Sequence, residues 1–271
     1  MASLPGGTFL MGSDTGQSDE RPVHEVFLSP FELSSHQVTH AEYAGFLRDT
    51  DWPTPKQWCA PGLDNPAGPA CGVSWVDAVR YCMWLNESSG AAADGMRYHL
   101  PTEAQLEYAG RGGVAGAVYP WGDAEPPRRG YYARGLEGPK VGRPMAVGTV
   151  AWWPAHPADG IGPAPGPFGL HNLADNVHEW CADYYARDYY ASSPRRDPPG
   201  PAASDRRVAT AGSWRHDLKF APNAARSSLS PVKRFTDFGF RVARSAGFAY
   251  VFCDADPSPR ILTGDLPHPP S

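Results

Sequence analysis

The abundance of glycine and proline is the feature that most restricts the fold of this chain. There are 29 glycines and 30 prolines among 271 residues. Proline lacks the backbone N–H that helices and sheets use, and glycine loses the most conformational freedom inside them. Much of the backbone must therefore be loop, and the 9 tryptophans and 12 tyrosines are expected to fill the spaces between loops.

Charge and hydropathy argue against two classes of partner. The net charge is −5 and there is no run of Lys or Arg, so a nucleic-acid partner is not expected. No apolar stretch approaches the roughly 20 residues of a membrane span. The start, MASLPGG, lacks the basic and apolar regions of a signal peptide. We therefore expect a cytoplasmic protein that binds neither nucleic acid nor membrane.

Cysteine usage favours reduced thiols. The five cysteines form an odd set without a CxxC motif, which argues against a disulfide framework or a structural zinc site. Only Cys59 and Cys71 lie where a bridge is conceivable, and the alternative is that both are free. Cys82 recurs with Tyr81 and Leu85 at helical spacing, so we expect it in the core.

Three segments carry a local signal for a helix start. In each, a hydroxyl residue stands three positions before a carboxylate or amide, the spacing of a capping box. The predicted helices follow Thr39 in THAEYAGFLRD, Ser74 in SWVDAVRYCMWLNE and Thr102 in PTEAQLEYAGRGG. Gly112 and Gly113 are suited to end the third helix in a left-handed conformation.

Short strands are predicted at both ends of the chain. They are GTFLMGS near residue 10, VHEVFLSPFEL from Val23 and DFGFRVAR from Asp237. We expect these strands to pair and to bring the two ends of the domain together. Between Gly113 and Phe168 the sequence is turn-rich, and such long loop regions are often functional. We predict one domain over residues 1–253 and a proline-rich, mobile tail over residues 254–271.

A series of blocks points to a known family. In order they are PGGTFLMGS, ERPVHEV, GVSWVDAVRYCMWLNE, LPTEAQLEYAGRGG, YPWGD, FGLHNLADNVHEWCADYY, AGSW and GFRVAR. From about Pro5 to Arg244 the sequence resembles the formylglycine-generating enzymes, or sulfatase-modifying factors. The resemblance implies an α+β, loop-rich variant of the C-type-lectin-like fold with little regular secondary structure.

The resemblance also implies a chemistry that this sequence does not reproduce. Formylglycine-generating enzymes carry two cysteines shortly after a GGSW block, which bind copper and oxidise a substrate cysteine. Here residues 212–227 read GSWRHDLKFAPNAARS, and no cysteine lies between Cys181 and Cys253. The thiolate pair that would hold Cu(I) is missing, so formylglycine generation by that mechanism is not expected.

A calcium site is expected in HNLADNVHEW, residues 171–180. Its side chains supply oxygen atoms of the kind that Ca²⁺ prefers. The resemblance implies that Asn172 and Glu179 bind through side chains, and Asp175 and Val177 through carbonyl oxygens. The alternative is that these polar groups only cap turns.

Histidines near the GSW block are candidates for a redox metal, either Fe(II) or Cu. Two histidines and one carboxylate suffice for non-haem iron. His216, which lies where the resemblance places the active site, is the strongest candidate, with Asp217 to orient its ring and His178 as a second ligand. His36 and His40 are further candidates. The alternative for each histidine is an ordinary hydrogen-bonded role.

The remaining candidate residues describe a pocket. Trp214 and Phe220 are expected to form an apolar wall. Arg226 and Arg241 either pair with internal carboxylates or bind an anionic ligand. The predicted catalytic residues are thus His216, Asp217, Trp214 and Arg226.

These candidate residues are compatible with two functions. The first is an oxidative enzyme, an oxidase or oxygenase, that acts on a small metabolite or on a residue bound to a peptide or carrier, with a metal that activates oxygen. The second is a non-catalytic, C-type-lectin-like binding module for a peptide, protein or sugar.

Overall fold

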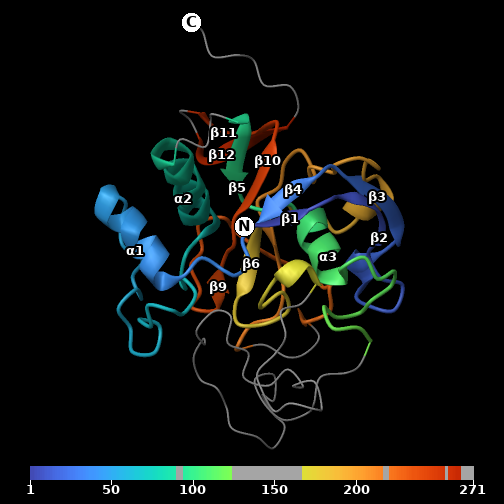
Figure 1. The fold of residues 1–271 in the computed structure, drawn as a ribbon, viewed down its shortest axis with the longest axis horizontal. Coiled ribbons are helices and arrows are strands. Elements are labelled where there is room, and N and C mark those ends of the chain that lie inside the picture. The colour runs from blue at the N-terminus through green and yellow to red at the C-terminus, as the bar shows by residue number, and fades with distance from the viewer. Residues whose placement is uncertain (90–93, 124–166, 216–219, 254–255, 264–271) are drawn as a thin grey trace, which may run out of the picture.

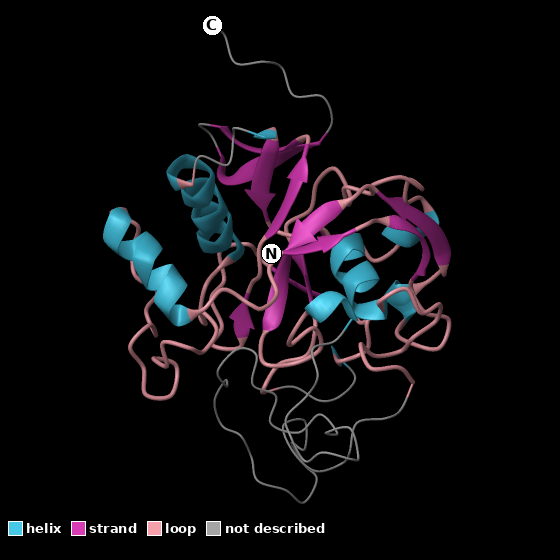
Figure 2. Cartoon of the chain, viewed as in Figure 1, coloured by secondary structure: helices cyan, strands magenta, loops and turns pink. Residues whose placement is uncertain are grey.

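In the part of the chain that the structure describes, three α-helices and a set of short strands are joined by loops (Figures 1 and 2). The structure is a computed structural model that describes residues 1–89, 94–123, 167–215, 220–253 and 256–263. The helices are α1 (His40–Asp49), α2 (Trp75–Ser88) and α3 (Glu103–Arg111). None of the described helices is long and apolar enough to cross a membrane.

All three predicted helix starts are confirmed. The side chains of Thr39, Ser74 and Thr102 each accept a hydrogen bond from the third backbone N–H of their helix, and the reciprocal bond of the capping box is present in every case. Gly112 ends α3 with φ 59°, the left-handed conformation that glycine adopts without strain. These boundaries are set by residues only three positions apart, which is why the sequence predicts them.

One sheet joins the two ends of the domain. Its strand order is β1 (Ala2–Leu4), β4 (Phe31–Leu33), β10 (Ala243–Ala246) and β5 (Met96–His99), and every pair is antiparallel. Leu33 of β4 lies opposite Ala243 of β10. The predicted pairing of N-terminal and C-terminal strands is therefore confirmed.

A second sheet carries the segments of functional interest. Its order is β8 (Ser227–Leu229), β7 (Arg207–Thr210), β6 (His178–Tyr184) and β9 (Phe238–Gly239), with β6 and β9 parallel. Two hairpins complete the fold: β2 (Gly7–Met11) with β3 (His24–Leu28), and β11 (Phe248–Cys253) with β12 (Asp256–Thr263). The segment predicted to be a mobile tail thus contains a paired strand.

Aromatic residues fill the core, as the composition predicts. The Tyr43 and Tyr81 rings of α1 and α2 stack with centroids 5.8 Å apart, and Phe240 lies edge-on to Tyr81 at 5.3 Å. The indole N–H groups of Trp75 and Trp180 donate to backbone carbonyls at 2.8 and 3.0 Å. The burial of these two indoles therefore leaves neither N–H group unpaired.

No disulfide joins the cysteines whose side chains the structure describes. Cys71, Cys82 and Cys181 are buried and unbridged, and Cys59 is exposed and unbridged. Cys82 is fully buried in the core that α1 and α2 share, as its helical spacing predicts.

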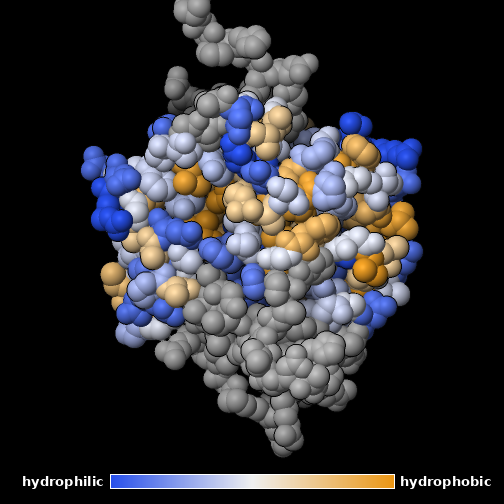
Figure 3. All heavy atoms as spheres, viewed as in Figure 1, coloured by the Kyte–Doolittle hydropathy of each residue, from blue (hydrophilic) through white to orange (hydrophobic). Residues whose placement is uncertain are grey.

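On the face shown in Figure 3, hydrophilic residues cover the outer edge at α1, and hydrophobic residues form a band across the middle.

Candidate active site

The second sheet brings two distant segments together. The polar turn, residues 171–177, leads into β6, and the GSW loop, residues 211–215, follows β7. Because β6 and β7 are antiparallel, with Glu179 opposite Thr210, the start of one strand meets the end of the other. The short β9 adds the segment that begins at Asp237, whose carbonyl accepts from the N–H of His178 at 2.8 Å.

Backbone hydrogen bonds tie the GSW loop to the polar turn. The N–H of Gly212 donates to the carbonyl of Ala174 at 3.1 Å, and that of Trp214 donates to the carbonyl of Asn176 at 3.0 Å. Ala211 enters the loop with φ 61°, a left-handed conformation that costs a non-glycine residue about 1–2 kcal/mol. The loop therefore holds a strained position that its contacts with the turn maintain.

A serine, an aspartate and an arginine form the floor of the GSW loop. The Ser213 hydroxyl donates to the Asp237 carboxylate at 3.1 Å, and both residues are buried. The Arg215 guanidinium reaches the other Asp237 oxygen at 3.4 Å, while 38% of its side chain stays exposed. This cluster presents a partly exposed cation above a buried carboxylate.

Trp214 lies at the edge of this floor. Its side chain is half-buried, and its indole N–H donates to the carbonyl of Thr236 at 3.4 Å. The Arg215 guanidinium lies 5.7 Å from the centre of the indole ring. Trp214 thus places a half-buried indole beside the Arg215 guanidinium. His216 and Asp217, the predicted catalytic residues that follow this loop, lie outside the described residues.

His178 is packed behind the GSW loop. It is fully buried, and its Nδ1 lies 2.5 Å from the carbonyl oxygen of Ala211, so this nitrogen carries the proton. The Phe220 and Phe238 rings contact its imidazole, with centroids at 5.6 and 4.9 Å. Among the described residues, no three histidine, cysteine or acidic side chains come together as metal ligands.

The other candidate histidines have structural contacts. His40 stacks on Trp58 with ring centroids 3.7 Å apart, and its Nε2 lies 3.1 Å from the Trp58 carbonyl oxygen. His36 contacts the carbonyl of Gln37 through Nδ1 at 2.9 Å. His171, which the sequence did not mark as a candidate, has a lowered pKa; burial is the larger cause, and the charges of His36 and Arg241 add to it.

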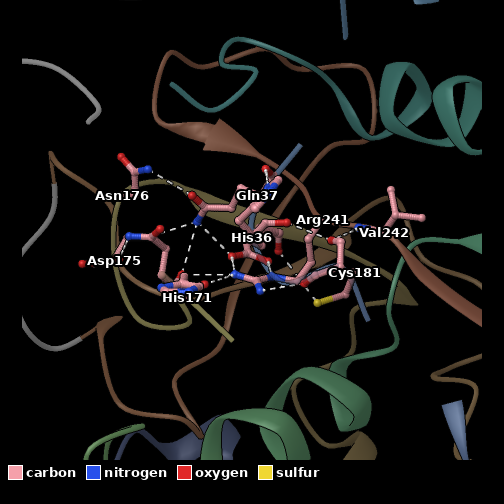
Figure 4. A network of polar contacts seen from close by, with 11 residues as sticks. His36, Gln37, His171, Asp175, Asn176, Cys181, Arg241 and Val242 are labelled. Carbon is pink, nitrogen blue, oxygen red and sulfur yellow. Dashed lines mark hydrogen bonds and ion pairs between the residues drawn. The ribbon is translucent and has the colours of Figure 1, made fainter. Parts of the chain in front are cut away.

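A buried ion pair closes the polar turn (Figure 4). The Arg241 guanidinium donates to both oxygens of Glu179, at 2.6 and 2.7 Å, and both side chains are buried. The same guanidinium reaches the carbonyls of Ser34, His171 and Asn172. Arg241 therefore has the structural role that was one of its two predicted roles.

The predicted calcium ligands have partners within the protein. The Asn172 amide donates to the Asp175 carboxylate at 2.8 Å, and the Val177 N–H donates to the Asp175 carbonyl at 3.0 Å. Gln37 donates to Glu179 at 2.9 Å. Burial, with a smaller effect from the nearby Glu179, raises the pKa of Asp175 to about 6.

Arg226 pairs with Glu103 at the start of α3. Its Nε and Nη2 donate to the two carboxylate oxygens at 2.7 and 3.0 Å, and Nη1 donates to the carbonyls of Asp19 and Ala186. Both side chains are almost completely buried. This geometry favours the structural alternative for Arg226 over its predicted catalytic role.

Asp183 lies beside this ion pair and gives a pH prediction. It accepts from the N–H of Glu103 at 2.8 Å, and burial together with the charge of Glu103 raises its pKa to about 7. Because the folded pKa is raised, Asp183 contributes stability below its ordinary pKa, and this is lost as pH rises to 7. We expect the Tm of Asp183→Asn to fall less between pH 4 and pH 8 than the Tm of wild type does. Thermal melts across this pH range measure the difference. The exposed Asp188→Asn is the control, and equal declines in all three proteins would contradict the prediction.

Described residues also line a large cavity to which Ser213, Arg215 and Asp237 do not contribute. It has a volume of about 540 Å³ and is bounded by the loop at residues 12–17, by Arg111 and by Pro222 and Ala224. Glu20 is almost fully buried at its wall, and burial raises its pKa. Pro222 and Ala224 belong to the segment that follows the GSW loop, so this segment contributes to the wall of the cavity.

Sequence reasoning missed four residues of the floor and the polar turn: Gln37, Ser213, Arg215 and Asp237. Ser213 stands inside the AGSW block and Asp237 directly before GFRVAR, so each adjoins a recognisable motif. Gln37 has no comparable signal. Its contact with Glu179 joins residues that are 142 positions apart.

Comparison with known proteins identifies the family. The model of the sulfatase-modifying factor enzyme 1-like domain, FGE-sulfatase, matches residues 1–246. The chain belongs to this family. The formylglycine-generating enzyme of Streptomyces coelicolor is 34% identical over 292 residues, which cover 90% of this chain and 88% of the relative. The inactive C-alpha-formylglycine-generating enzyme 2 of Mus musculus is 29% identical, with 91% and 86% covered.

Solved structures agree with this assignment. PvdO from Pseudomonas aeruginosa is similar with a TM-score of 0.70 at 26% identity, over 90% of this chain and 93% of PvdO. Treponema denticola variable protein 1 has a TM-score of 0.71 at 21% identity, over 90% and 94%, which is a likeness of fold alone. The predicted fold class, the loop-rich α+β formylglycine-generating-enzyme variant of the C-type-lectin-like fold, is confirmed.

Proposed function

We propose that this member of the FGE-sulfatase family is a metal-dependent oxidative enzyme that acts on a small metabolite or on a residue bound to a peptide or carrier. It is not a copper–cysteine formylglycine generator. The observation that carries the proposal is the floor of the GSW loop, where Ser213, Asp237 and Arg215 form one polar cluster. No cysteine stands between this loop and Cys253, so the copper–cysteine ligand set does not fit this chain.

The residues of the floor support binding and orientation of a substrate. The Arg215 guanidinium is partly exposed, and a carboxylate or phosphate on a substrate is the group it can bind in a bidentate manner. The Asp237 carboxylate accepts one hydrogen bond from that guanidinium and another from the Ser213 hydroxyl, so it fixes the position of both groups. Trp214 supplies an apolar surface beside it. Iron or copper bound by His216 would supply the activation of oxygen.

The Asp237 cluster also anchors the peptide that continues into His216. The Arg215 N–H donates to the Ser213 hydroxyl at 3.3 Å, and the Trp214 N–H donates to the polar turn. A histidine ligand must be oriented to bind a metal well, and a rigid preceding segment favours that orientation. This supports His216 as the first ligand to test.

Metal analysis tests the proposal. Protein purified without oxygen and treated with Fe(II) or Cu(I) is expected to retain about one redox metal per chain. A His216→Ala variant should lose it, whereas His268→Ala, which removes a histidine outside the matched residues, should retain it. Elemental analysis after desalting gives the metal content. Equal retention in all three proteins would rule out His216 as a ligand, and no retention in wild type would reject the oxidative function.

A second candidate is a non-catalytic binding module for a peptide, protein or sugar. It is favoured by the mouse relative whose name describes it as inactive and which shares 29% identity with this chain. This function predicts affinity without turnover. A wild-type protein that holds no redox metal but binds a peptide or glycan in a direct binding assay would make this candidate the better one.

A further inference from the structure

Gln37 occupies the centre of the polar turn. Its side-chain nitrogen lies 2.9 Å from the Glu179 carboxylate, 3.1 Å from the Asp175 carbonyl and 3.3 Å from the Asn172 carbonyl. Figure 4 shows this nitrogen pointing into the turn from the segment that precedes α1. Two of these oxygens, those of Asp175 and Glu179, are ones that the family resemblance implies as calcium ligands.

The orientation of this amide follows from its neighbours. The nitrogen faces three acceptor oxygens, and the Gln37 oxygen accepts from the Asn176 amide at 3.1 Å. A reversed amide would bring an oxygen against three oxygens and a nitrogen against a donor. Gln37 is therefore held as a donor at the point where the oxygens converge.

This arrangement does not fit Ca²⁺, which takes 6–8 oxygen ligands at about 2.3–2.6 Å around one point. The Asp175 carbonyl already accepts from Gln37 and from the Val177 N–H, which uses both of its lone pairs. Glu179 accepts from Arg241 through both oxygens, so its charge is already neutralised.

We propose that Gln37 and Arg241 together take the place of a bound cation, so that the polar turn keeps its structure without calcium. Arg241 supplies the positive charge, as the ion would, and donates to the His171 carbonyl at 2.8 Å as well as to Glu179. The Gln37 amide donates hydrogen bonds to the oxygens that would otherwise coordinate a cation. The domain is then independent of calcium, and Gln37 is the residue that makes it so.

Thermal melts of the full chain, in CaCl₂ and in EDTA, test this proposal. The wild-type Tm is expected to be equal in both, within about 1 °C, because no site is open to the ion. A Gln37→Glu variant replaces the donor by a second carboxylate beside Glu179. Its Tm in EDTA should be lower than that of wild type, and millimolar calcium should raise it by about 5 °C or more.

Two controls make the result specific. Gln57→Glu adds the same charge at an exposed position and should show no response to calcium. Gln37→Met keeps the length of the side chain but removes its donors, so its Tm should fall equally in CaCl₂ and EDTA. If Gln37→Glu does not fold, the wild-type comparison still decides. One calcium ion bound per wild-type chain in titration calorimetry, with a raised Tm, would overturn the proposal. This outcome is independent of the redox-metal test of His216.

Discussion

An Arg241→Met variant is expected to lose about 3–5 kcal/mol of the free energy of unfolding, because it leaves the Glu179 carboxylate buried without its counter-charge. Arg241 donates to both oxygens of Glu179 and to the carbonyl of His171, and its side chain is fully buried. Methionine has a similar length but no donors. The loss is therefore electrostatic rather than a loss of packing alone.

Urea unfolding followed by circular dichroism measures this loss. Arg244→Met is the matched control, since Arg244 follows closely in β10 but pairs with Glu32 nearer the surface. It is expected to cost no more than about 1 kcal/mol. A double variant, Arg241→Met with Glu179→Met, should recover part of the loss because no buried charge remains. Equal effects of the Arg241 and Arg244 substitutions would refute the structural role of Arg241.

The second large effect is expected at Arg226. An Arg226→Met variant should also lose about 3–5 kcal/mol, because Glu103 is then left buried beside Asp183 with no cation. The exposed Arg187→Met is expected to change stability by less than about 1 kcal/mol. The same unfolding measurement compares them.

This experiment also separates the two roles that the sequence leaves open for Arg226. If Arg226 holds loops together through Glu103, the double variant Arg226→Met with Glu103→Met should be more stable than Arg226→Met alone. If Arg226 instead serves a ligand, stability should change little and ligand binding should be lost. Unchanged stability in Arg226→Met would therefore restore its predicted role in the pocket.

Arg226 and Arg241 show why the residue type alone does not decide whether an arginine binds a ligand or pairs with an internal carboxylate. Arg226 and Arg241 were candidates either for an anionic ligand or for an internal carboxylate. The structure pairs them with Glu103 and Glu179, partners that lie 123 and 62 positions away. Arg215, in contrast, pairs with Asp237 beside Trp214 while 38% of its side chain stays exposed, so it is the arginine that we propose binds a substrate.

Local sequence was sufficient for the three helix starts and for the strand segments near the two ends of the chain, whereas β5 to β8 were not predicted. A capping box needs only two side chains three positions apart, and its energy does not depend on distant residues. The glycine and proline content was enough to predict a loop-rich domain, and the strand segments near the two ends were enough to predict a shared sheet. The α+β class was implied by the family resemblance.

The polar network of the site depended on the tertiary structure. The sequence marked residues 171–180 as rich in oxygen ligands, but it contained no signal that Gln37 would place its amide among them or that Arg241 would neutralise Glu179. These contacts form only when β6, the segment between β9 and β10, and the segment before α1 are brought together across 62 to 142 positions of sequence. Hydrogen bonds and ion pairs act over a few ångströms, so which groups meet is decided by the path of the whole chain.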